Sequence, residues 1–387
     1  MSDAPRTIVV EEAGSGALLG FVAIDSTIGG RARGGLRMMP DVSQDELEKL
    51  ARAMTLKYGF LGLPQGGAKA GVLGDPECGA EGRAAALHRF AKAIRPLLER
   101  REYVPDSDMG TRGAEIQRML ESVGVPVSRR EYRGDRSGDY TAATVFEAAR
   151  AAAAVRGLTL SECKVAIEGF GKVGRPLAGM FVGAGARVVA ISTSFGGLYD
   201  PRGLDVDRPG GEKIENSRLK EIPADIFCPC ARHDSVQASD VARVSATVVS
   251  CGANSPVTPQ AEELLWRRGT LCVPDFVANC GGVLGGTMEF CGWRPEQIFA
   301  FCAGPFRTAV EGLIRRALAT GKPLRELAEE VALLRFDQAK RKAERPSAAG
   351  RCFSAGIALY RAGWVPAQLV RRVSKGYFDG RMPDGLQ

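Results

Sequence analysis

The sequence predicts an α/β protein whose later part is built on a doubly wound parallel sheet. Between residues 164 and 273, short apolar segments alternate with helical or turn-rich ones, which is typical of parallel strands joined by crossover connections. The first third mixes strands with helices, and the chain from Pro295 to its end has a mostly helical pattern. A length of 387 residues is enough for about two or three domains.

The composition is that of an ordinary water-soluble globular protein. Hydrophobic residues make up 45% of the chain and charged residues 25%, and no segment approaches the ~18 apolar residues of a membrane span. Residues 1–6 contain no apolar core of a signal peptide, so we expect a cytoplasmic protein without a membrane partner. A net charge of +7 favours anionic small molecules but does not by itself indicate nucleic acid, and we expect no nucleic-acid partner.

The cysteine pattern argues against a metal centre. The chain has 10 cysteines, which are scattered, and 2 histidines. One proline separates Cys228 from Cys230, whereas paired metal ligands usually have a two-residue gap. We therefore expect free thiols in a reducing compartment and no metal site.

The first third is expected to contain two strands and two helices. In chain order they cover residues 7–10, 18–24, 43–60 and 84–98. Ser43 and Glu46 have the spacing of a capping box, which marks the start of the first helix. Residues 128–139 are polar, basic and turn-rich, and we interpret them as a solvated surface loop near a domain boundary. Their arginines could alternatively bind phosphate.

Alternation begins after an alanine-rich helix over residues 141–155. The expected elements then follow in order: strand 164–167, helix 173–182, and strands 187–191, 224–227, 246–250 and 270–273.

Two lysines indicate a perturbed site. Lys57 falls on the apolar stripe that includes Leu50 and Met54, where a lysine is rarely tolerated unless an anion meets it. Lys69 lies in the glycine-rich segment 62–71, predicted to be a loop that lets a backbone or a ligand come close. Two crowded, partly desolvated lysines lower each other's pKa and provide a candidate general base. The alternative is that Lys57 extends to the surface and the loop is only a tight connection.

A glycine motif predicts a dinucleotide site. Gly169, Gly171 and Gly174 follow an apolar strand and open a helix, with Lys172 and Val173 between the last two glycines. This spacing allows a tight turn and brings a pyrophosphate close to the N-terminus of the helix. An ordinary glycine turn is the alternative.

The second strand of this unit ends without the acidic residue that usually binds the ribose of NAD. Thr193 lies there between two serines, and these small hydroxyls do not repel a 2′-phosphate. Lys172 or Arg175 can assist such a phosphate, so both NAD and NADP stay open. Glu168 adds a negative charge beside the glycines unless it faces away.

Seven motifs in a fixed order resemble the glutamate/leucine/phenylalanine/valine dehydrogenase family. The resemblance runs from about Arg31 to Val283. The motifs cover residues 34–38, 54–57, 63–69, 104–110, 140–142, 252–259 and 274–283. Each motif alone is weak, but the ordered set is highly specific.

The resemblance implies a two-domain fold and a homo-oligomer. An N-terminal α/β domain binds substrate and forms the oligomer, and it covers residues 1–140 with 335–387. A Rossmann-type domain binds NAD or NADP over residues 141–334. The C-terminal helices pack back across the cleft between the two domains.

The resemblance also implies an activity, the reversible oxidative deamination of an L-α-amino acid to a 2-oxo acid and ammonia. Lys57 would bind the α-carboxylate, Lys69 would activate water against the imine carbon, and Asp108 would exchange protons with the amino nitrogen. Further positions implied in binding are Gly34, Arg33, Asn279 and Val283 for the substrate, and Thr141, Asn254, Thr193 and the glycine motif with Lys172 and Val173 for the cofactor. Asn279 would orient either the substrate carboxylate or the carboxamide. A biosynthetic or regulatory homologue with altered or no turnover is the alternative.

Three positions depart from the family's patterns. Arg33 stands where glutamate-specific members have a lysine that grips the side-chain carboxylate. Asp106 stands where an alanine forms the pocket wall, and Gly286 where glutamate-type members have a serine. Arg33 and Asp106 either contact the ligand or pair with each other, so the amino-acid side chain that is recognised stays open.

Overall fold

The structure is a computed structural model that describes residues 4–128, 136–380 and 382. Its contacts divide the chain into two compact units, Met1–Asp135 with Ala332–Arg372 and Arg136–Val331 with Val373–Gln387. These units differ from the domains expected from the sequence, which were 1–140 with 335–387 and 141–334. The expected domain boundaries stay a prediction. Most of the arginine-rich loop, residues 129–135, lies outside the described residues.

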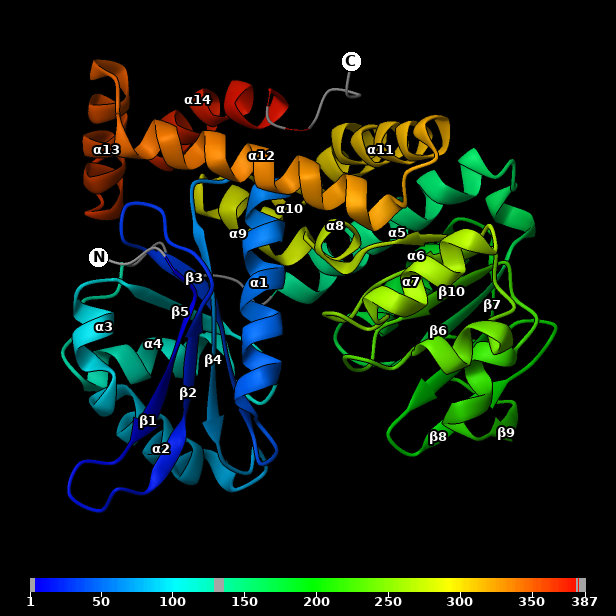
Figure 1. Ribbon diagram of the computed structural model, residues 1–387, viewed down its shortest axis with the longest axis horizontal. Helices are drawn as coiled ribbons and strands as arrows, with labels where there is room; N and C mark the ends of the chain where they lie inside the picture. The colour runs from blue at the N-terminus through cyan, green and yellow to red at the C-terminus, as the bar shows by residue number, and fades with distance from the viewer. Residues whose placement is uncertain (1–3, 129–135, 381, 383–387) are drawn as a thin grey trace. The chain divides into compact units, whose positions relative to one another are not determined.

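The described residues of the first unit contain a five-stranded mixed sheet (Figure 1). Its strands, in spatial order, are β1 (Arg6–Glu11), β2 (Leu18–Ile24), β4 (Gly66–Leu73), β3 (Ala32–Met39) and β5 (Tyr103–Ser107). Strand β3 runs parallel to β4 on one side and to β5 on the other, whereas β1, β2 and β4 pair antiparallel. The carboxyl ends of β3, β4 and β5 therefore meet at one edge of the sheet.

Helices cover both faces of this sheet. Helix α1 (Gln44–Phe60) lies on one face (Figure 1). It begins after Ser43 as predicted, and Ser43 Oγ accepts a hydrogen bond from Glu46 N, which is one half of the predicted capping box, whereas the carboxylate of Glu46 contacts Arg37. Helices α2 (Gly79–Ala93) and α4 (Gly113–Ser122) pack on the other face, where they form the main core. The single helix expected over 84–98 is instead α2 followed by the short α3 (Arg95–Glu99), because Pro96 occupies the first turn of a new helix.

The glycine-rich segment around Lys69 is strand β4, so its prediction as a loop was wrong. A Cβ on Gly67 would lie 2.3 Å from the backbone nitrogen of Thr55, and one on Gly71 would lie 2.4 Å from a methyl of Val42. Glycine at these positions lets α1 lie directly on the strand. The strand lacks the usual β-branched residues on this face because the helix leaves no room for them.

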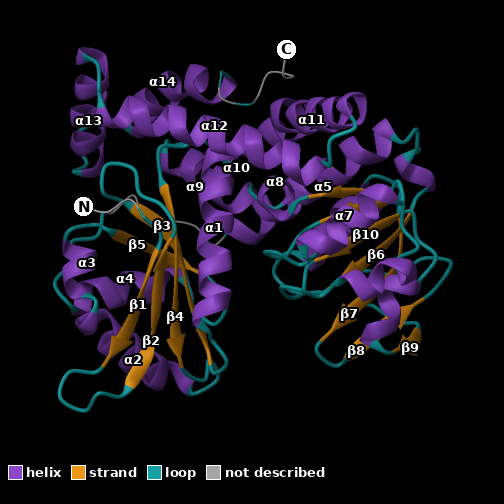
Figure 2. Cartoon of the chain, viewed as in Figure 1, coloured by secondary structure: helices purple, strands orange, loops and turns teal. Residues whose placement is uncertain are grey.

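The strands described for the second unit form one sheet of seven (Figure 2). In spatial order they are β12 (Leu271–Val273), β11 (Val248–Ser250), β10 (Ile226–Pro229), β6 (Lys164–Glu168), β7 (Arg187–Thr193), β8 (Gly196–Tyr199) and β9 (Glu212–Ile214). The five from β12 to β7 are parallel, which confirms the doubly wound sheet, and the hairpin strands β8 and β9 are antiparallel additions. The α/β fold class predicted from the sequence is thus confirmed.

Helices of the second unit surround this sheet, and the C-terminal part is helical as predicted. They are α5 (Ser137–Val155), α6 (Gly174–Gly183), α7 (Pro259–Arg267), α8 (Asp275–Ala278), α9 (Gly281–Phe290), α10 (Pro295–Phe301) and α11 (Arg307–Thr320). Helix α5 begins four residues before the predicted start at Thr141 and packs against α9 and α11. Three helices complete the chain: α12 (Leu324–Glu344), α13 (Ala348–Arg361) and α14 (Ala367–Asp379). None of the helices in the described ranges is long and apolar enough to cross a membrane.

Candidate active site

A buried cluster of charges joins three neighbouring strands of the first unit. Lys69 on β4 places its Nζ 2.8 Å from Oδ2 of Asp108, the residue after β5. Arg37 on β3 donates from Nε to the same oxygen at 3.0 Å, and its Nη1 contacts Glu46 of α1. The side chains of Lys69 and Arg37 are 4% and 6% exposed. Two cations thus converge on one carboxylate with little access to water.

Gly35 on β3 makes room for this cluster. A Cβ at that position would lie 2.8 Å from Cβ of Asp108 and 3.1 Å from Nζ of Lys69. Thr111 fixes the turn that carries Asp108, since its hydroxyl accepts from Asp108 N at 3.0 Å and donates to the carbonyl of Leu36 at 2.7 Å. Backbone geometry and a missing side chain therefore hold the two reactive groups together.

Burial and neighbouring charges shift both pKa values. Burial lowers the pKa of Lys69, with a further lowering by Arg37, and Asp108 opposes this. Burial raises the pKa of Asp108, but Lys69 and Arg37 outweigh it, so that pKa lies below the ordinary value of 3.8. Arg37 can keep Asp108 ionised when Lys69 is neutral. We expected a second lysine to lower the pKa of Lys69. In the structure the main cause of the lowered pKa is burial.

Lys57 lies in the last turn of α1 and is 5% exposed. It is therefore buried, and the alternative in which it extends to the surface is wrong. The apolar stripe that it follows is buried at Leu47 and Leu50, as the helical spacing predicted.

Arg33 and Asp106 pair with each other on β3 and β5. Nη2 of Arg33 lies 3.0 Å from Oδ2 of Asp106, and their side chains are 28% and 45% exposed. Gly34 has a packing reason to be glycine, since a Cβ there would lie 1.5 Å from the carbonyl oxygen of Ala68 on β4. Tyr103 donates to the carbonyl of Gly34 at 3.1 Å, which fixes that strand from the other side.

The glycine motif of the second unit fits a dinucleotide. Gly169 has φ +89°, and a Cβ on Gly174 would lie 1.9 Å from the carbonyl oxygen of Gly169, so a side chain is excluded at both. A Cβ on Gly171 would meet nothing within 4 Å, which leaves the N-terminus of α6 open to a phosphate. Lys172 and Val173 complete this turn, and Gly169 N donates to Ser192 Oγ at 3.0 Å.

The end of β7 and Glu168 are both engaged with protein groups. Thr193 accepts a hydrogen bond from Phe195 N at 3.1 Å and donates to the carbonyl of Gly196 at 3.2 Å. Ser235 donates to Oε2 of Glu168 at 2.7 Å. Burial raises the pKa of Glu168 and the Ser235 hydrogen bond lowers it in part, so this carboxylate faces its neighbouring loop.

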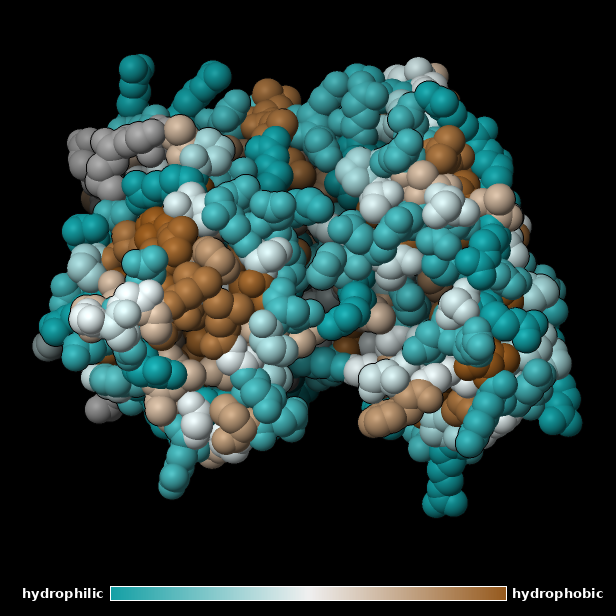
Figure 3. Space-filling model, turned by 60° about the horizontal axis from the view of Figure 1, so that its bottom comes forward, coloured by the Kyte–Doolittle hydropathy of each residue, from teal (hydrophilic) through white to brown (hydrophobic). Residues whose placement is uncertain are grey.

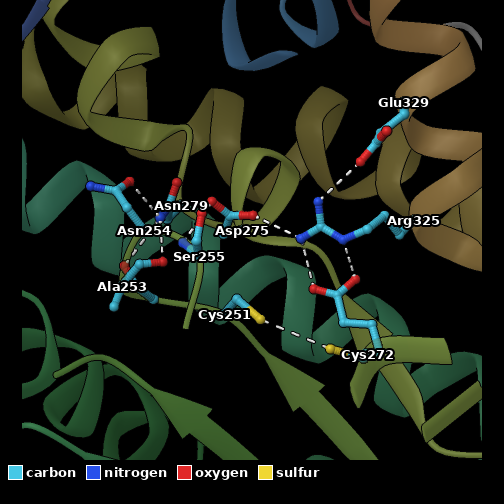
Figure 4. A network of polar contacts seen from close by, with 11 residues as sticks. Cys251, Ala253, Asn254, Ser255, Cys272, Asp275, Asn279, Arg325 and Glu329 are labelled. Carbon is cyan, nitrogen blue, oxygen red and sulfur yellow. Dashed lines mark hydrogen bonds and ion pairs between the residues drawn. The ribbon is translucent and has the colours of Figure 1, made fainter. Parts of the chain in front are cut away.

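Asn279 has an acceptor that no described protein group uses (Figure 4). Its Nδ2 donates to the carbonyl of Ala253 at 2.7 Å and contacts Oδ1 of Asn254 at 3.2 Å. Its buried Oδ1 has no hydrogen-bond partner within the described residues. A buried unpaired acceptor is costly in a folded protein, so Oδ1 of Asn279 is available to accept a hydrogen bond from a bound molecule.

The other predicted positions of this unit lie on helices. Thr141 on α5 donates to the carbonyl of Ser137 at 2.7 Å, and a Cβ on Gly282 would lie 3.0 Å from its hydroxyl. Val283, in the first turn of α9, is half-buried, and Gly286 is exposed with nothing within 4 Å of a built Cβ.

Comparison with known proteins decides the family. The model of the Glu/Leu/Phe/Val dehydrogenase dimerisation domain matches residues 6–124, and the model of Glutamate/Leucine/Phenylalanine/Valine dehydrogenase matches residues 135–209 and 208–343. The chain belongs to this dehydrogenase family. It is accordingly an oxidoreductase that acts on the CH–NH2 group and uses NAD or NADP.

Curated relatives and solved structures agree with this assignment. The chain is 33% identical over 317 residues to a glutamate dehydrogenase of Thermotoga maritima, covering 74% of this chain and 75% of that one. It is 32% identical over 302 residues to an NAD-specific glutamate dehydrogenase of Staphylococcus aureus, covering 71% and 72%. A hetero-hexameric glutamate dehydrogenase of Thermus thermophilus, in a leucine-bound form, is similar with a TM-score of 0.75 and 27% identity, covering 87% and 89%. The L-tryptophan dehydrogenase of Nostoc punctiforme shares the fold, with a TM-score of 0.63 and 20% identity, covering 87% and 96%.

Two residues that organise this candidate site were missed from the sequence. Arg37, which bridges Asp108 and Glu46, received no role, although a lone arginine between Leu36 and Met38 in a buried strand is a usable signal. The second is Arg325 of α12, which had no local signal because its partners lie far away in the sequence.

Arg325 holds the loop of Asn254 in place. Its guanidinium binds both oxygens of buried Glu262, at 2.6 and 2.7 Å. It also binds Oδ1 of buried Asp275 at 3.1 Å (Figure 4). The other oxygen of Asp275 accepts from Ser255 N at 2.9 Å, where the backbone has φ 48°.

One group of side chains in the described residues has the spacing of metal ligands. The ligand atoms of Cys251, Glu262 and Cys272 lie within 4.8 Å of one another, but Glu262 is already engaged by Arg325. The expected absence of a metal stays a prediction.

Proposed function

We propose that this chain catalyses the reversible NAD(P)-dependent oxidative deamination of an L-α-amino acid to a 2-oxo acid and ammonia. The observation that carries the proposal is the convergence of Lys69 and Arg37 on Asp108 in a buried cluster. This arrangement provides a lysine with a lowered pKa beside a carboxylate that is ionised in the resting site. The lysine can act as a base toward water, and the carboxylate can accept a proton from the substrate nitrogen.

Three residues of the first unit would have separate tasks in this reaction. Lys57 binds the α-carboxylate and positions Cα, because a fixed ammonium removes the orientational freedom of the substrate. Asp108 takes a proton from the substrate ammonium, since the nitrogen must be unprotonated before Cα can lose a hydride. A nicotinamide cofactor held at the turn from Gly169 to Gly174 would supply the hydride acceptor. Lys69 in its neutral form then removes a proton from the water that attacks the imine carbon. Asp108 returns its proton to the nitrogen, the C–N bond breaks, and ammonia leaves as the new hydroxyl loses its proton to give the 2-oxo acid.

The second unit would hold the cofactor. The turn from Gly169 to Gly174 would receive the pyrophosphate, with Thr193 beside the ribose and Thr141 and Asn254 beside the nicotinamide half. The free Oδ1 of Asn279 is an acceptor, which suits the NH2 of a carboxamide rather than a carboxylate. Val283 and Gly34 would line the substrate site. We expect NADP to be accepted as well as NAD, because no acid follows β7.

We also propose a homo-oligomer in the cytoplasm, formed through the first unit. The family model that matches residues 6–124 describes a dimerisation domain. Val9 of the edge strand β1 and Leu18 of β2 are exposed, and Figure 3 shows apolar residues gathered on the surface of this unit, at the left of the view. Exposed apolar patches on soluble proteins are typical of association surfaces.

A substrate screen tests the proposed function. Purified protein is incubated with each common L-amino acid and with NAD or NADP, and the reduced nicotinamide is followed by its absorbance. The reverse reaction is followed with 2-oxo acids, ammonia and reduced cofactor. We expect turnover in both directions with at least one matched pair. Binding of the nucleotide without turnover of any substrate would instead favour the regulatory homologue.

A further inference from the structure

We propose that the ion pair of Arg33 and Asp106 makes this dehydrogenase select L-α-amino acids with an uncharged side chain and reject those with an acidic one. The inference rests on the proposed function and states which class of substrate the same site takes. Several relatives are named glutamate dehydrogenase. Under this proposal, the substrate that this chain prefers differs from the one in those names.

The ion pair lies on the same face of the sheet as the Lys69–Asp108 pair. A Cβ on Gly35 would meet both Lys69 and Asp108, so Gly35 of β3 faces that pair. Alternate residues of a strand face the same side, which places Arg33 on this face, and Asp106 lies two residues before Asp108. Two residues of a strand span about 7 Å, a distance that the side chain of an amino acid covers.

The two ends of this face leave different amounts of room. At one end Arg37 is 6% exposed and contacts two carboxylates, so protein atoms fill that end. At the other end the side chains of Arg33 and Asp106 are 28% and 45% exposed. A substrate whose Cα is held beside Asp108 therefore finds space for its side chain toward Arg33 and Asp106.

Asp106 is fixed beside the guanidinium of Arg33. One of its oxygens lies 3.0 Å from Nη2 of Arg33, and the other accepts from Ser107 N at 3.0 Å. The wall at this end thus carries a neutral ion pair.

A second substrate carboxylate would meet an unfavourable environment at this wall. It would have to displace Asp106 from Arg33, or lie next to Asp106 as a like charge, and in either case one carboxylate loses water without gaining a cation of its own. An uncharged side chain requires neither change. The pair therefore discriminates by repulsion against acidic side chains rather than by a new attraction.

Kinetics with L-glutamate and L-glutamine test the inference, because the two side chains have the same size and differ in charge. We expect the wild type to show at least ~100-fold higher kcat/KM with the best uncharged amino acid, among glutamine, norvaline and leucine, than with glutamate. In Asp106→Asn the ratio of kcat/KM for glutamate to that for glutamine should rise at least ~10-fold, since the amide keeps the shape and loses the charge. Asp106→Glu retains the charge and should keep the low ratio.

A double variant identifies Arg33 as the cation that Asp106 neutralises. In Arg33→Leu/Asp106→Asn the gain for glutamate should disappear, because the two positions are coupled. A wild type that uses glutamate best, or a glutamate to glutamine ratio unchanged in Asp106→Asn, would overturn the inference while the proposed function stands. If no amino acid is oxidised under any condition, the proposed function fails and the inference fails with it.

Discussion

At the scale of single residues, the site depends on what glycine leaves out as much as on the charges themselves. Lys69 and Asp108 come from separate strands, and Gly35 of the strand between them removes the side chain that would push them apart. Arg37 then balances Asp108, so that Lys69 can lose its proton without leaving the carboxylate unpaired. A lysine with a lowered pKa and an acid that is ionised in the resting site thus lie within hydrogen-bonding distance of each other.

Gly35→Ala should inactivate the enzyme without unfolding it. The added methyl would lie 2.8 Å from Cβ of Asp108, so the Lys69–Asp108 pair must shift, and we expect kcat to fall at least ~10²-fold, the usual loss when acid–base groups are misplaced. Gly179→Ala on α6 is the matched control, because a Cβ there meets nothing within 4 Å and turnover should be unchanged. Equal activities of the two variants would show that Gly35 does not determine the geometry of the site.

Asp108 should make the free energy of unfolding depend on pH in the acidic range. Its folded-state pKa lies below the ordinary 3.8, so ionised Asp108 contributes stability above that value and loses it as the pH falls toward the folded pKa. In that pH range the unfolded state binds up to one proton more than the folded state. The free energy of unfolding therefore falls by up to about 1.4 kcal/mol for each unit that the pH decreases. Denaturant unfolding at several pH values should show a shallower dependence in Asp108→Asn than in the wild type. Parallel curves would mean that Asp108 has an ordinary pKa in the folded protein.

At the scale of elements, the contact of α1 with β4 positions the lysines. Strand β4 presents glycine to the helix on either side of Lys69, so the helix lies directly on the strand and buries Lys57 near its C-terminus. This is also where prediction from the sequence was wrong. Glycine in a strand normally marks a turn, and the reason for it here, the close approach of a helix distant in sequence, cannot be read from the strand alone.

Gly67→Ala tests this packing. Its Cβ would lie 2.3 Å from Thr55 N, so α1 must move, and we expect a loss of about 1–3 kcal/mol in the free energy of unfolding, as for other overpacked sites. Gly74 comes directly after the same strand, and Gly74→Ala is the control. A Cβ there would lie 3.4 Å from Cε of Met38, an ordinary contact with a flexible side chain, so the loss of stability should be small. Chemical denaturation of both variants measures the difference. A similar stability for the two would indicate that the helix does not depend on glycine at position 67.

At the scale of the whole molecule, the sequence predicted the α/β class, the parallel sheet of the second unit and the family. These features follow from local patterns such as the alternation of strands and helices and the turn at Gly169. Contacts between distant segments could not be predicted in the same way. Arg325 reaches Glu262 and Asp275, and Arg37 reaches Asp108, only after the chain has folded. The sequence left open whether Arg33 and Asp106 pair, and the fold brings them to 3.0 Å.

Turnover of Lys69→Ala tests the chemistry proposed for this fold most directly. The best amino acid from the screen is oxidised by the variant and by the wild type at saturating cofactor, and nucleotide binding is measured separately as a control for folding. Loss of the general base should lower kcat at least ~10²-fold while the affinity for the nucleotide is unchanged. A variant that turns over at nearly the wild-type rate would contradict the assignment of Lys69 as the base.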